Sequence, residues 1–304
     1  MKAIAFSLAL CVVMFVVAIC VGGSGVGFPD DAWLQRTRSL RALTALVTGM
    51  GLSLGGVWSQ ALFRNELVEP FLLGLSGGAA AGAVISLWLF PGVSPAFGAA
   101  AGALGAALVV RALAWQSEAA LLLTGVAVGS MTGSLAGLVL TTARQEQLLR
   151  PATHWLWGGF ADPNPQLLAA GAASLIAGLS LTWGARDHLD RLLLGDELAT
   201  SLGTPVKLVR GIGFGLIAVL TAVCVLCGGI VGFVGLLAPH VARRWVSGSH
   251  VVMPFVACLL GGALLVGSDA LARSAFAPKE VPTGLFTSLC GAPLFLLALR
   301  KRLA

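Results

Sequence analysis

Eight long stretches of this 304-residue chain contain no Asp, Glu, Lys or Arg. They cover residues 3–29, 42–63, 70–110, 119–143, 163–185, 211–242, 245–268 and 281–299. A helix that crosses a bilayer needs about 20 apolar residues, so every stretch has room for at least one such helix. Only 11% of the residues are charged, against about 25% in ordinary soluble domains. The chain is therefore expected to be an all-α polytopic membrane protein, and this composition excludes an ordinary globular enzyme or a disordered chain.

The number of spans depends on two stretches. Residues 70–110 are long enough for two helices, broken at Pro91-Gly92 and Pro95. Residues 211–242 could form one long helix or two short ones, with Gly228-Gly229 as the break. We interpret residues 3–22 as a retained first helix, since no clear A-x-A cleavage site follows them. These choices predict nine or ten spans.

The distribution of Lys and Arg favours ten spans with both termini in the cytoplasm, because cytoplasmic loops carry an excess of these residues. In that arrangement twelve are cytoplasmic, namely Lys2, Arg64, Arg111, Arg186, Arg191, Lys207, Arg210, Arg243, Arg244, Arg300, Lys301 and Arg302. Seven are outside, namely Arg36, Arg38, Arg41, Arg144, Arg150, Arg273 and Lys279. The net charge of +6 reflects this bias, and we expect no nucleic-acid partner.

Small residues recur at helical spacing within the stretches. Four glycines follow one another at every fourth position from Gly125 to Gly137, and Gly78/Gly82 and Gly98/Gly102 repeat the spacing. Because lipid supplies no hydrophobic drive between helices, close approach through small residues holds such bundles together. We expect tight helix packing at these positions. The six cysteines all lie in apolar stretches, where packing is the expected role.

Residues that could bind an ion, catalyse a reaction or bind a nucleotide are scarce. No Asp or Glu is predicted inside a span: Asp269 and Glu280 fall at a helix border, and Glu66, Glu69 and Glu118 fall in inner loops. This disfavours an ion-coupled secondary transporter of a small solute, which keeps ionisable groups at depth, and that class remains the alternative. An intramembrane enzyme is disfavoured too, and we expect no catalytic or metal site. No lysine stands in a G-K-[ST] motif, so any ATPase must be a separate chain.

The most charged inner loop covers residues 186–207. It predicts two short helices, one at about 187–194 that ends before Gly195, and one from Asp196 as N-cap to Gly203. Leu198 and Leu202 fall on one face of the second helix. Such a pair can lie on lipid headgroups or be offered to a soluble partner, and the loop alone leaves both open.

Two segments resemble a known family. Glu197-Leu198-Ala199 with Gly203 is similar to the E-A-A-x-x-x-G signature of ABC-importer permeases. Residues 55–78, GGVWSQALFRNELVEPFLLGLSGG, resemble G-x-x-x-Q-x-x-x-R-N-P-L-A-x-P-x-x-L-G-x-x-x-G. The matching residues of this second segment are Gln60, Arg64, Asn65, Leu67, Pro70, Leu73, Gly74 and Gly78. The chain departs from the pattern with Glu66 in place of Pro and Val68 in place of Ala.

Further motifs follow in the same order. Residues 194–203 resemble L-G-x-x-x-A-x-x-L-G, and residues 232–243 resemble G-F-[VI]-G-L-x-x-P-H-x-x-R. Residues 269–295 contain segments similar to D-x-x-A-R, E-[LI]-P-x-G and G-A-P-x-F. The motif residues expected to be structural here are Gly235, Pro239, His240, Arg243, Pro282, Gly284, Gly291 and Pro293. The chain thus resembles the permease subunits of binding-protein-dependent ABC importers for ferric siderophores, haem and cobalamin.

This resemblance implies a type II importer fold, with residues 1–304 forming one permease domain of the bacterial inner membrane. It implies a homodimer with the substrate path at its interface, two ATPase subunits that hold the ATP and Mg, and a periplasmic binding protein. The residues implied to contact the ATPase are Asp196, Glu197, Leu198, Ala199, Leu202 and Gly203. Those implied to dock the binding protein are Arg38, Arg41 and Arg273. Membrane lipids are the remaining partners, no cofactor is expected in this chain, and topology places the inner gate near residues 116–119.

Overall fold

The computed structural model describes residues 2–22, 25–28, 31–90, 92–114, 117–142, 156–246, 251–277 and 279–303. Within these ranges ten helices have twelve residues or more. They are α1 (Lys2–Cys20), α2 (Ala32–Leu62), α3 (Leu75–Leu89), α4 (Pro95–Ala114), α5 (Glu118–Thr142), α7 (Pro165–Leu192), α9 (Val206–Gly228), α10 (Val234–Trp245), α11 (Met253–Ser274) and α12 (Thr283–Leu303). The shorter elements are a 3-10 helix η1 (Pro70–Leu73), the helix α8 (Asp196–Ser201), and an antiparallel hairpin of β1 (Val21–Gly22) and β2 (Gly25–Val26).

The predicted apolar segments correspond in order to these ten helices, which confirms the all-α class. The two breaks predicted within long stretches are also confirmed: α3 ends before Pro91 and α4 begins at Pro95, while α9 ends at Gly228. Pro91 itself lies outside the described residues, as do Arg144, Arg150 and Gln116.

The number of membrane crossings remains a prediction. Seven of the described helices are long and apolar enough to cross a membrane by length and composition. Helix α3 has 15 residues and α10 has 12, and at 1.5 Å per residue α10 is only about 18 Å long, against a hydrocarbon core of about 30 Å. Helix α10 by itself is therefore shorter than the hydrocarbon core.

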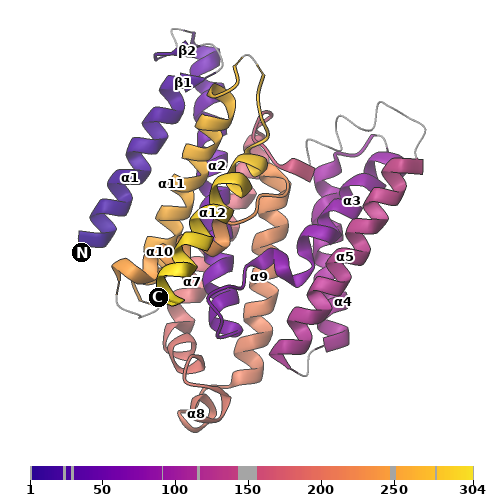
Figure 1. Ribbon diagram of the computed structural model, residues 1–304, viewed down its shortest axis with the longest axis vertical. Coiled ribbons are helices and arrows are strands. Elements are labelled where there is room, and N and C mark those ends of the chain that lie inside the picture. The colour runs from indigo at the N-terminus through magenta and orange to yellow at the C-terminus, as the bar shows by residue number, and fades with distance from the viewer. Residues whose placement is uncertain are drawn as a thin grey trace.

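Helices α2 and α11 form the centre of the molecule. In each, 72% of the most apolar 18-residue window is buried, against 17% in α1 and in α5. Figure 1 shows α3, α4 and α5 side by side on one flank, with α1 on the other flank and α12 in front. The β hairpin lies at one end of the bundle and α8 at the other, and both chain ends lie toward α8 (Figure 1). We call these the hairpin end and the α8 end.

Glycines allow the central helices to touch through their backbones. A Cβ atom at Gly49 of α2 would lie 2.3 Å from the carbonyl oxygen of Gly261 on α11. Between α3 and α4, a Cβ at Gly82 would lie 2.0 Å from the oxygen of Gly98, and one at Gly102 would lie 2.1 Å from that of Gly78. The predicted close packing at these α3 and α4 glycines is confirmed.

The glycine series of α5 is divided between two environments. Gly125 and Gly129 pack against the backbone at Leu72–Gly74, whereas Gly133 and Gly137 have no neighbour within 4 Å among the described residues. The first half of the predicted glycine ridge therefore supports packing within the chain, and the second half faces away from it.

Two non-helical segments meet inside the bundle. Residues 63–74 lead from the end of α2 to α3, and residues 229–233 connect α9 to α10. The Oε2 atom of Glu69 accepts a hydrogen bond of 3.0 Å from the backbone N–H of Phe233. Glu69 lies in the loop between α2 and η1, and its carboxylate satisfies a backbone donor that no helix supplies with a partner.

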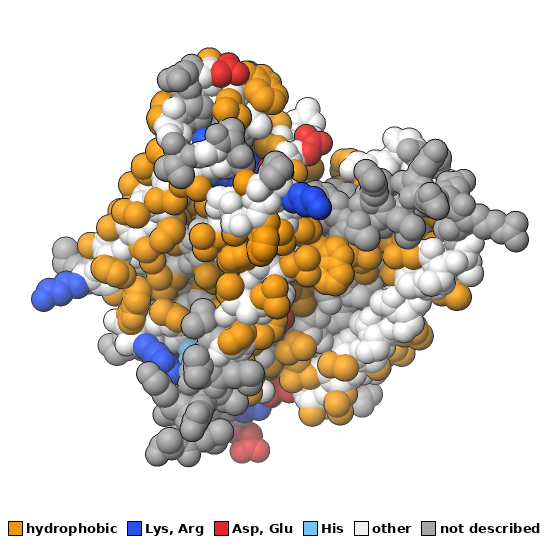
Figure 2. Space-filling model, turned by 45° about the horizontal axis from the view of Figure 1, so that its top comes forward, with side chains coloured by type: hydrophobic (Ala, Val, Ile, Leu, Met, Phe, Trp, Pro, Cys, Tyr) orange, Lys and Arg blue, Asp and Glu red, His pale blue; other side chains and the backbone are white. Residues whose placement is uncertain are grey.

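The surface is apolar along the flank. Figure 2 shows hydrophobic side chains over the side of the molecule and acidic and basic ones toward its ends and edge. Large exposed apolar residues include Phe6 and Val13 of α1 and Leu123 and Met131 of α5. A continuous exposed apolar surface of this kind is expected of a protein that lies in lipid.

Candidate functional site

Helix α8 stands at one extreme of the molecule (Figure 1). Its Ala199 is fully buried in the apolar core that includes Leu189 and Leu192 of α7. The side chains of Leu198 and Leu202 face the other way and are 57% and 52% exposed. The prediction that both leucines share a face is confirmed, and that face is directed out of the chain.

Glycine turns bound α8 on each side. Gly195 has φ +100° and ψ 161°, a region that essentially only glycine occupies, and Gly203 has φ +82°. These turns let α7 reverse into α8 and α8 lead into α9 within a few residues. Arg191 of α7 donates a 3.0 Å hydrogen bond to the carbonyl of Leu202, which holds the turn closed.

Two predictions for this loop are wrong in detail. Residues 187–192 continue α7 without a break, so the first of the two predicted short helices is the end of a 28-residue helix. Asp196 is not the N-cap of α8, because Gly195 occupies that position and makes no side-chain cap. The Asp196 carboxylate is bound instead by Arg210 of α9, with Nη1–Oδ2 and Nη2–Oδ1 distances of 2.8 Å.

Arg210 belongs to a chain of ion pairs. Its Nη2 also contacts the Glu118 carboxylate at the start of α5, and Arg64, after α2, donates to the same carboxylate at 2.9 Å. We call Asp196, Arg210, Glu118 and Arg64 the α8-end ion network. Arg64 has a positive φ of 46°, uncommon for a residue other than glycine. The network joins the ends of α2, α5, α8 and α9.

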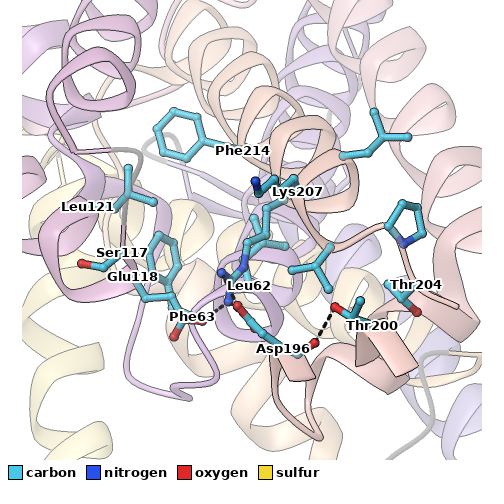
Figure 3. A pocket seen from close by; sticks show the side chains of 14 residues that line it. Leu62, Phe63, Ser117, Glu118, Leu121, Asp196, Thr200, Thr204, Lys207 and Phe214 are labelled. Carbon is cyan, nitrogen blue, oxygen red and sulfur yellow. Dashed lines mark hydrogen bonds and ion pairs between the residues drawn. The ribbon is translucent and has the colours of Figure 1, made fainter. Parts of the chain in front are cut away.

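A cavity of about 870 Å³ adjoins this network. Figure 3 shows Asp196 and Thr200 rising from α8 below, Ser117 and Glu118 on the opposite side, and Lys207 and Phe214 above. Its walls come from the end of α2, the start of α5, α8 and the first turns of α9. The cavity separates α8 from α5.

The three predicted docking arginines gather at the hairpin end. Arg41 of α2 makes two-pronged contacts with Asp269 of α11, at 3.0 Å from Nε and from Nη2, and donates to Glu280 at 2.9 Å. Arg38 donates to the carbonyl of Ile19 at 2.9 Å, and Arg273 donates to the carbonyl of Ala18. The hydroxyl of Thr283, at the start of α12, donates to Asp269 at 2.9 Å.

All three arginines are buried: Arg38 is 7% exposed, Arg41 8% and Arg273 3%. Each already has a hydrogen-bond partner within the chain, and together they tie the ends of α1, α2, α11 and α12. That they bind carboxylates of a docking protein stays a prediction. The expectation of no carboxylate within a span is wrong for Asp269, which lies inside α11 and is 1% exposed, and the reason is that Arg41 neutralises it.

Several motif residues meet where the non-helical segments cross. A Cβ at Gly235 would lie 3.0 Å from Pro70, and Gln60 is buried with its amide 3.5 Å from the Gly235 carbonyl. Gly74, at φ +81°, packs against Gly125. Asn65 accepts a hydrogen bond from the backbone N–H of Leu67 at 2.9 Å. Phe233 has a positive φ of 68°, which is strained for an aromatic residue, and Glu69 and this packing hold it there.

The remaining motif residues lie on α10 and α12. Pro239 and His240 are buried in α10, and His240 Nδ1 lies 3.6 Å from the Glu66 carboxylate. Arg243 lies in the last turn of α10. Gly284 and Gly291 allow α12 to approach Trp157 and Phe233 closely. Pro282 lies before α12 and Pro293 lies inside it. Both interrupt backbone hydrogen bonding, because proline has no N–H to donate. Among the described residues no three His, Cys, Asp or Glu side chains form a metal-binding group.

Sequence reasoning did not identify Arg210 and Glu118 as partners of Asp196. The sequence did hold a signal for this pairing, because the predicted topology placed the basic Arg210 and the acidic Glu118 and Asp196 on the same inner side. Their contact depends on the helix arrangement, since 78 residues separate Glu118 from Asp196 (196 − 118).

Comparison with known proteins identifies the architecture. A model of the FecCD transport family matches residues 10–301. The cobalamin import system permease protein BtuC of Halobacterium salinarum is 36% identical over 91% of this chain and 76% of that protein. The iron(3+)-hydroxamate import system permease protein FhuG of Bacillus subtilis is 33% identical over 90% and 84%. The hemin transport system permease protein HmuU of Yersinia pestis is 36% identical over 89% and 84%.

Comparison with solved structures indicates the same architecture. One described as an inward-facing conformation of a metal-chelate type ABC transporter has a TM-score of 0.88 at 28% identity, covering 99% of both chains. The structure of PsaBC from Streptococcus pneumoniae in complex with Fab has a TM-score of 0.63 at 20% identity, which shows a shared fold. Because the family model matches nearly the whole chain and these permeases are more than 30% identical to it over most of their length, this chain belongs to the FecCD transport family and is a permease subunit of an ABC importer.

Proposed function

We propose that this chain imports a large metal chelate across the bacterial inner membrane as a homodimer, driven by ATP that two partner ATPase subunits hydrolyse. The relatives whose names specify cobalamin, iron(3+)-hydroxamate and hemin support this class of substrate. Alternating access at the interface between the two copies would carry the chelate. ATP and Mg belong to the partner subunits in this proposal, since the chain lacks a G-K-[ST] motif.

The observation that carries the proposal is the outward face of α8. Leu198 and Leu202 are more than half exposed, Glu197 is exposed beside them, and Leu193 and Leu194 extend the apolar surface. Burying a leucine side chain contributes about 1.5–3 kcal/mol, so a cleft on a soluble partner that accepts this face would gain affinity. We place α8 and both termini on the cytoplasmic side, with ten crossings, in agreement with the excess of Lys and Arg there.

At the opposite end we place the docking surface for a periplasmic binding protein. Arg41 is buried, but Glu280, which it binds, has a side chain that is 46% exposed. A carboxylate of the binding protein would replace Glu280 on Arg41 Nη1, with Arg38 and Arg273 supplying further positive charge nearby. Such Arg–carboxylate contacts are directional and charge-assisted.

The proposal is tested with the permease reconstituted with its ATPase and binding protein in liposomes. Uptake of cobalamin, a ferric hydroxamate and hemin would be measured with ATP inside. The double variant Leu198→Asp/Leu202→Asp is expected to reduce ATPase co-purification about tenfold or more, as interface anchors do. Thr200→Ala, on the same helix but facing the cavity instead of the leucine face, is the matched control and should co-purify normally.

Two results would overturn the proposal. One is normal ATPase binding by the leucine double variant while the protein remains folded. The other is uptake that needs no ATP and follows a proton gradient, which would support the ion-coupled carrier instead.

A further inference from the structure

The start of α5 and the start of α9 are held together differently from the rest of the bundle. Backbone packing joins α8 to α7 and α9, and it joins α5 to α3, α4 and η1. Packing of α5 against α8 or α9 is slight among the described residues, because the cavity of about 870 Å³ lies between them. The α8-end ion network crosses this gap, because Arg210 contacts both Asp196 and Glu118.

Arg210 is at the centre of that crossing. Its guanidinium binds Asp196 of α8 through two parallel hydrogen bonds of 2.8 Å, and Nη2 also contacts Glu118 of α5. Arginine can hold two carboxylates at once because its donors are arranged as a planar fork. One side chain therefore binds the short helix on one side and the α5 terminus on the other.

The α5 side of the link is firmly fixed. Glu118 lies in the first turn of α5, where the helix dipole favours a negative charge. Arg64 binds the same carboxylate at 2.9 Å. The Glu118 and Arg210 side chains are each only 22% exposed, so solvent screens their attraction less than that of a pair in open water.

We propose that Arg210 is a positioning residue that transmits movement of α8 to the start of α5. Displacement of α8 moves Asp196, Asp196 moves the Arg210 guanidinium, and Glu118 moves with it. The start of α5 contains Glu118 and Ala119, the described part of the α5 start that topology assigns to the inner gate. This inference rests on the proposed function, because it requires that α8 be the element that an ATPase displaces.

The test measures chelate molecules transported per ATP hydrolysed by the reconstituted complex. Glu118→Gln keeps the size of the side chain and removes its charge, and is expected to lower this ratio about tenfold, a typical size for coupling between sites. ATPase co-purification and ATP hydrolysis should stay near those of the unchanged protein. The control is Glu66→Gln, the same chemical change in a carboxylate that lies 3.6 Å from His240 of α10. It should leave the ratio unchanged.

Two further variants separate transmission from support of the fold. Arg210→Lys keeps the positive charge but cannot form the two-pronged contact, and it should lower the ratio as well. The double variant Glu118→Gln/Arg210→Lys should be no worse than the more affected single variant, because both changes break one link.

An unchanged ratio in Glu118→Gln or in Arg210→Lys would overturn the inference. The inference would also be overturned if transport falls only in proportion to the amount of folded or assembled protein, because that result indicates a structural role. If the unchanged complex itself shows no ATP-driven uptake, the proposed function fails first. If the unchanged complex and both variants transport the same number of chelate molecules per ATP hydrolysed, the proposed function stands and only the proposed role of Arg210 fails.

Discussion

Asp269 shows how a single buried charge can be tolerated inside an apolar helix. Its two oxygens accept bonds from Arg41 at 3.0 Å and from Thr283 at 2.9 Å, and Arg273 Nε lies 3.7 Å away. A buried charge without partners is very costly, so this aspartate and these arginines require one another. The cluster therefore determines how the ends of α2, α11 and α12 meet.

Removal of the negative charge of Asp269 should destabilise the protein strongly. Asp269→Asn leaves Arg41 and Arg273 buried with too little negative charge, a change that typically costs about 3–5 kcal/mol. Glu280→Gln is the control: its side chain is 46% exposed, and solvent screening limits such a loss to about 1 kcal/mol. Melting temperatures of both variants in detergent check this. Equal melting temperatures would contradict the assignment of Asp269 as the centre of the cluster.

At the scale of elements, backbone contact between helices depends on individual glycines and not on glycine content. On α4, Gly102 touches the backbone of α3, while Gly105, three residues later, has no neighbour within 4 Å. Both belong to the same helix and the same apolar stretch. Sequence spacing identified Gly98/Gly102 as a packing pair, but only the structure shows which face of α4 lies against α3.

This difference predicts opposite effects of one substitution at two positions. Gly102→Ala would place a Cβ 2.1 Å from the Gly78 oxygen and should destabilise the α3–α4 contact by about 1–3 kcal/mol, as overpacking does. Gly105→Ala should be neutral or stabilising by up to about 1 kcal/mol, since alanine favours helix over glycine. Thermal unfolding of the purified variants measures both. A tolerated Gly102→Ala together with a damaging Gly105→Ala would contradict this packing.

For the whole molecule, the apolar flank and the charged ends define one axis that a membrane would cross. The hairpin and α8 lie at opposite ends of this axis, and both chain ends lie toward α8 (Figure 1). The location of both termini on the cytoplasmic side stays a prediction. The buried arginines lie at the hairpin end and the exposed leucines at the α8 end.

The orientation can be measured by labelling. Phe28→Cys at the hairpin end and Ser201→Cys on α8 both place a thiol at an exposed position. A membrane-impermeant maleimide should label the first in right-side-out vesicles and the second in inside-out vesicles. The unchanged protein, with its six cysteines, reports background labelling. The reverse pattern would contradict a cytoplasmic α8.

Much of this architecture follows from the sequence alone. The charge-free stretches locate the helices, and Gly and Pro locate the breaks at 91–95 and at Gly228-Gly229, because each of these signals acts within a few residues of itself. The shared face of Leu198 and Leu202 also follows from the helical repeat, and the structure shows that this face is exposed. The motifs then identify the family without reference to any contact.

Only the tertiary structure determined how distant charges pair. Arg41 and Asp269 are 228 residues apart, and Arg210 and Glu118 are 92 apart, so no local pattern connects them. The arginines predicted to dock a binding protein are buried, and Glu69 accepts a hydrogen bond from the N–H of Phe233. The physical reason is the same in each case. A polar group inside an apolar bundle must find a partner, and which partner lies within reach is decided by the packing of helices far apart in the chain.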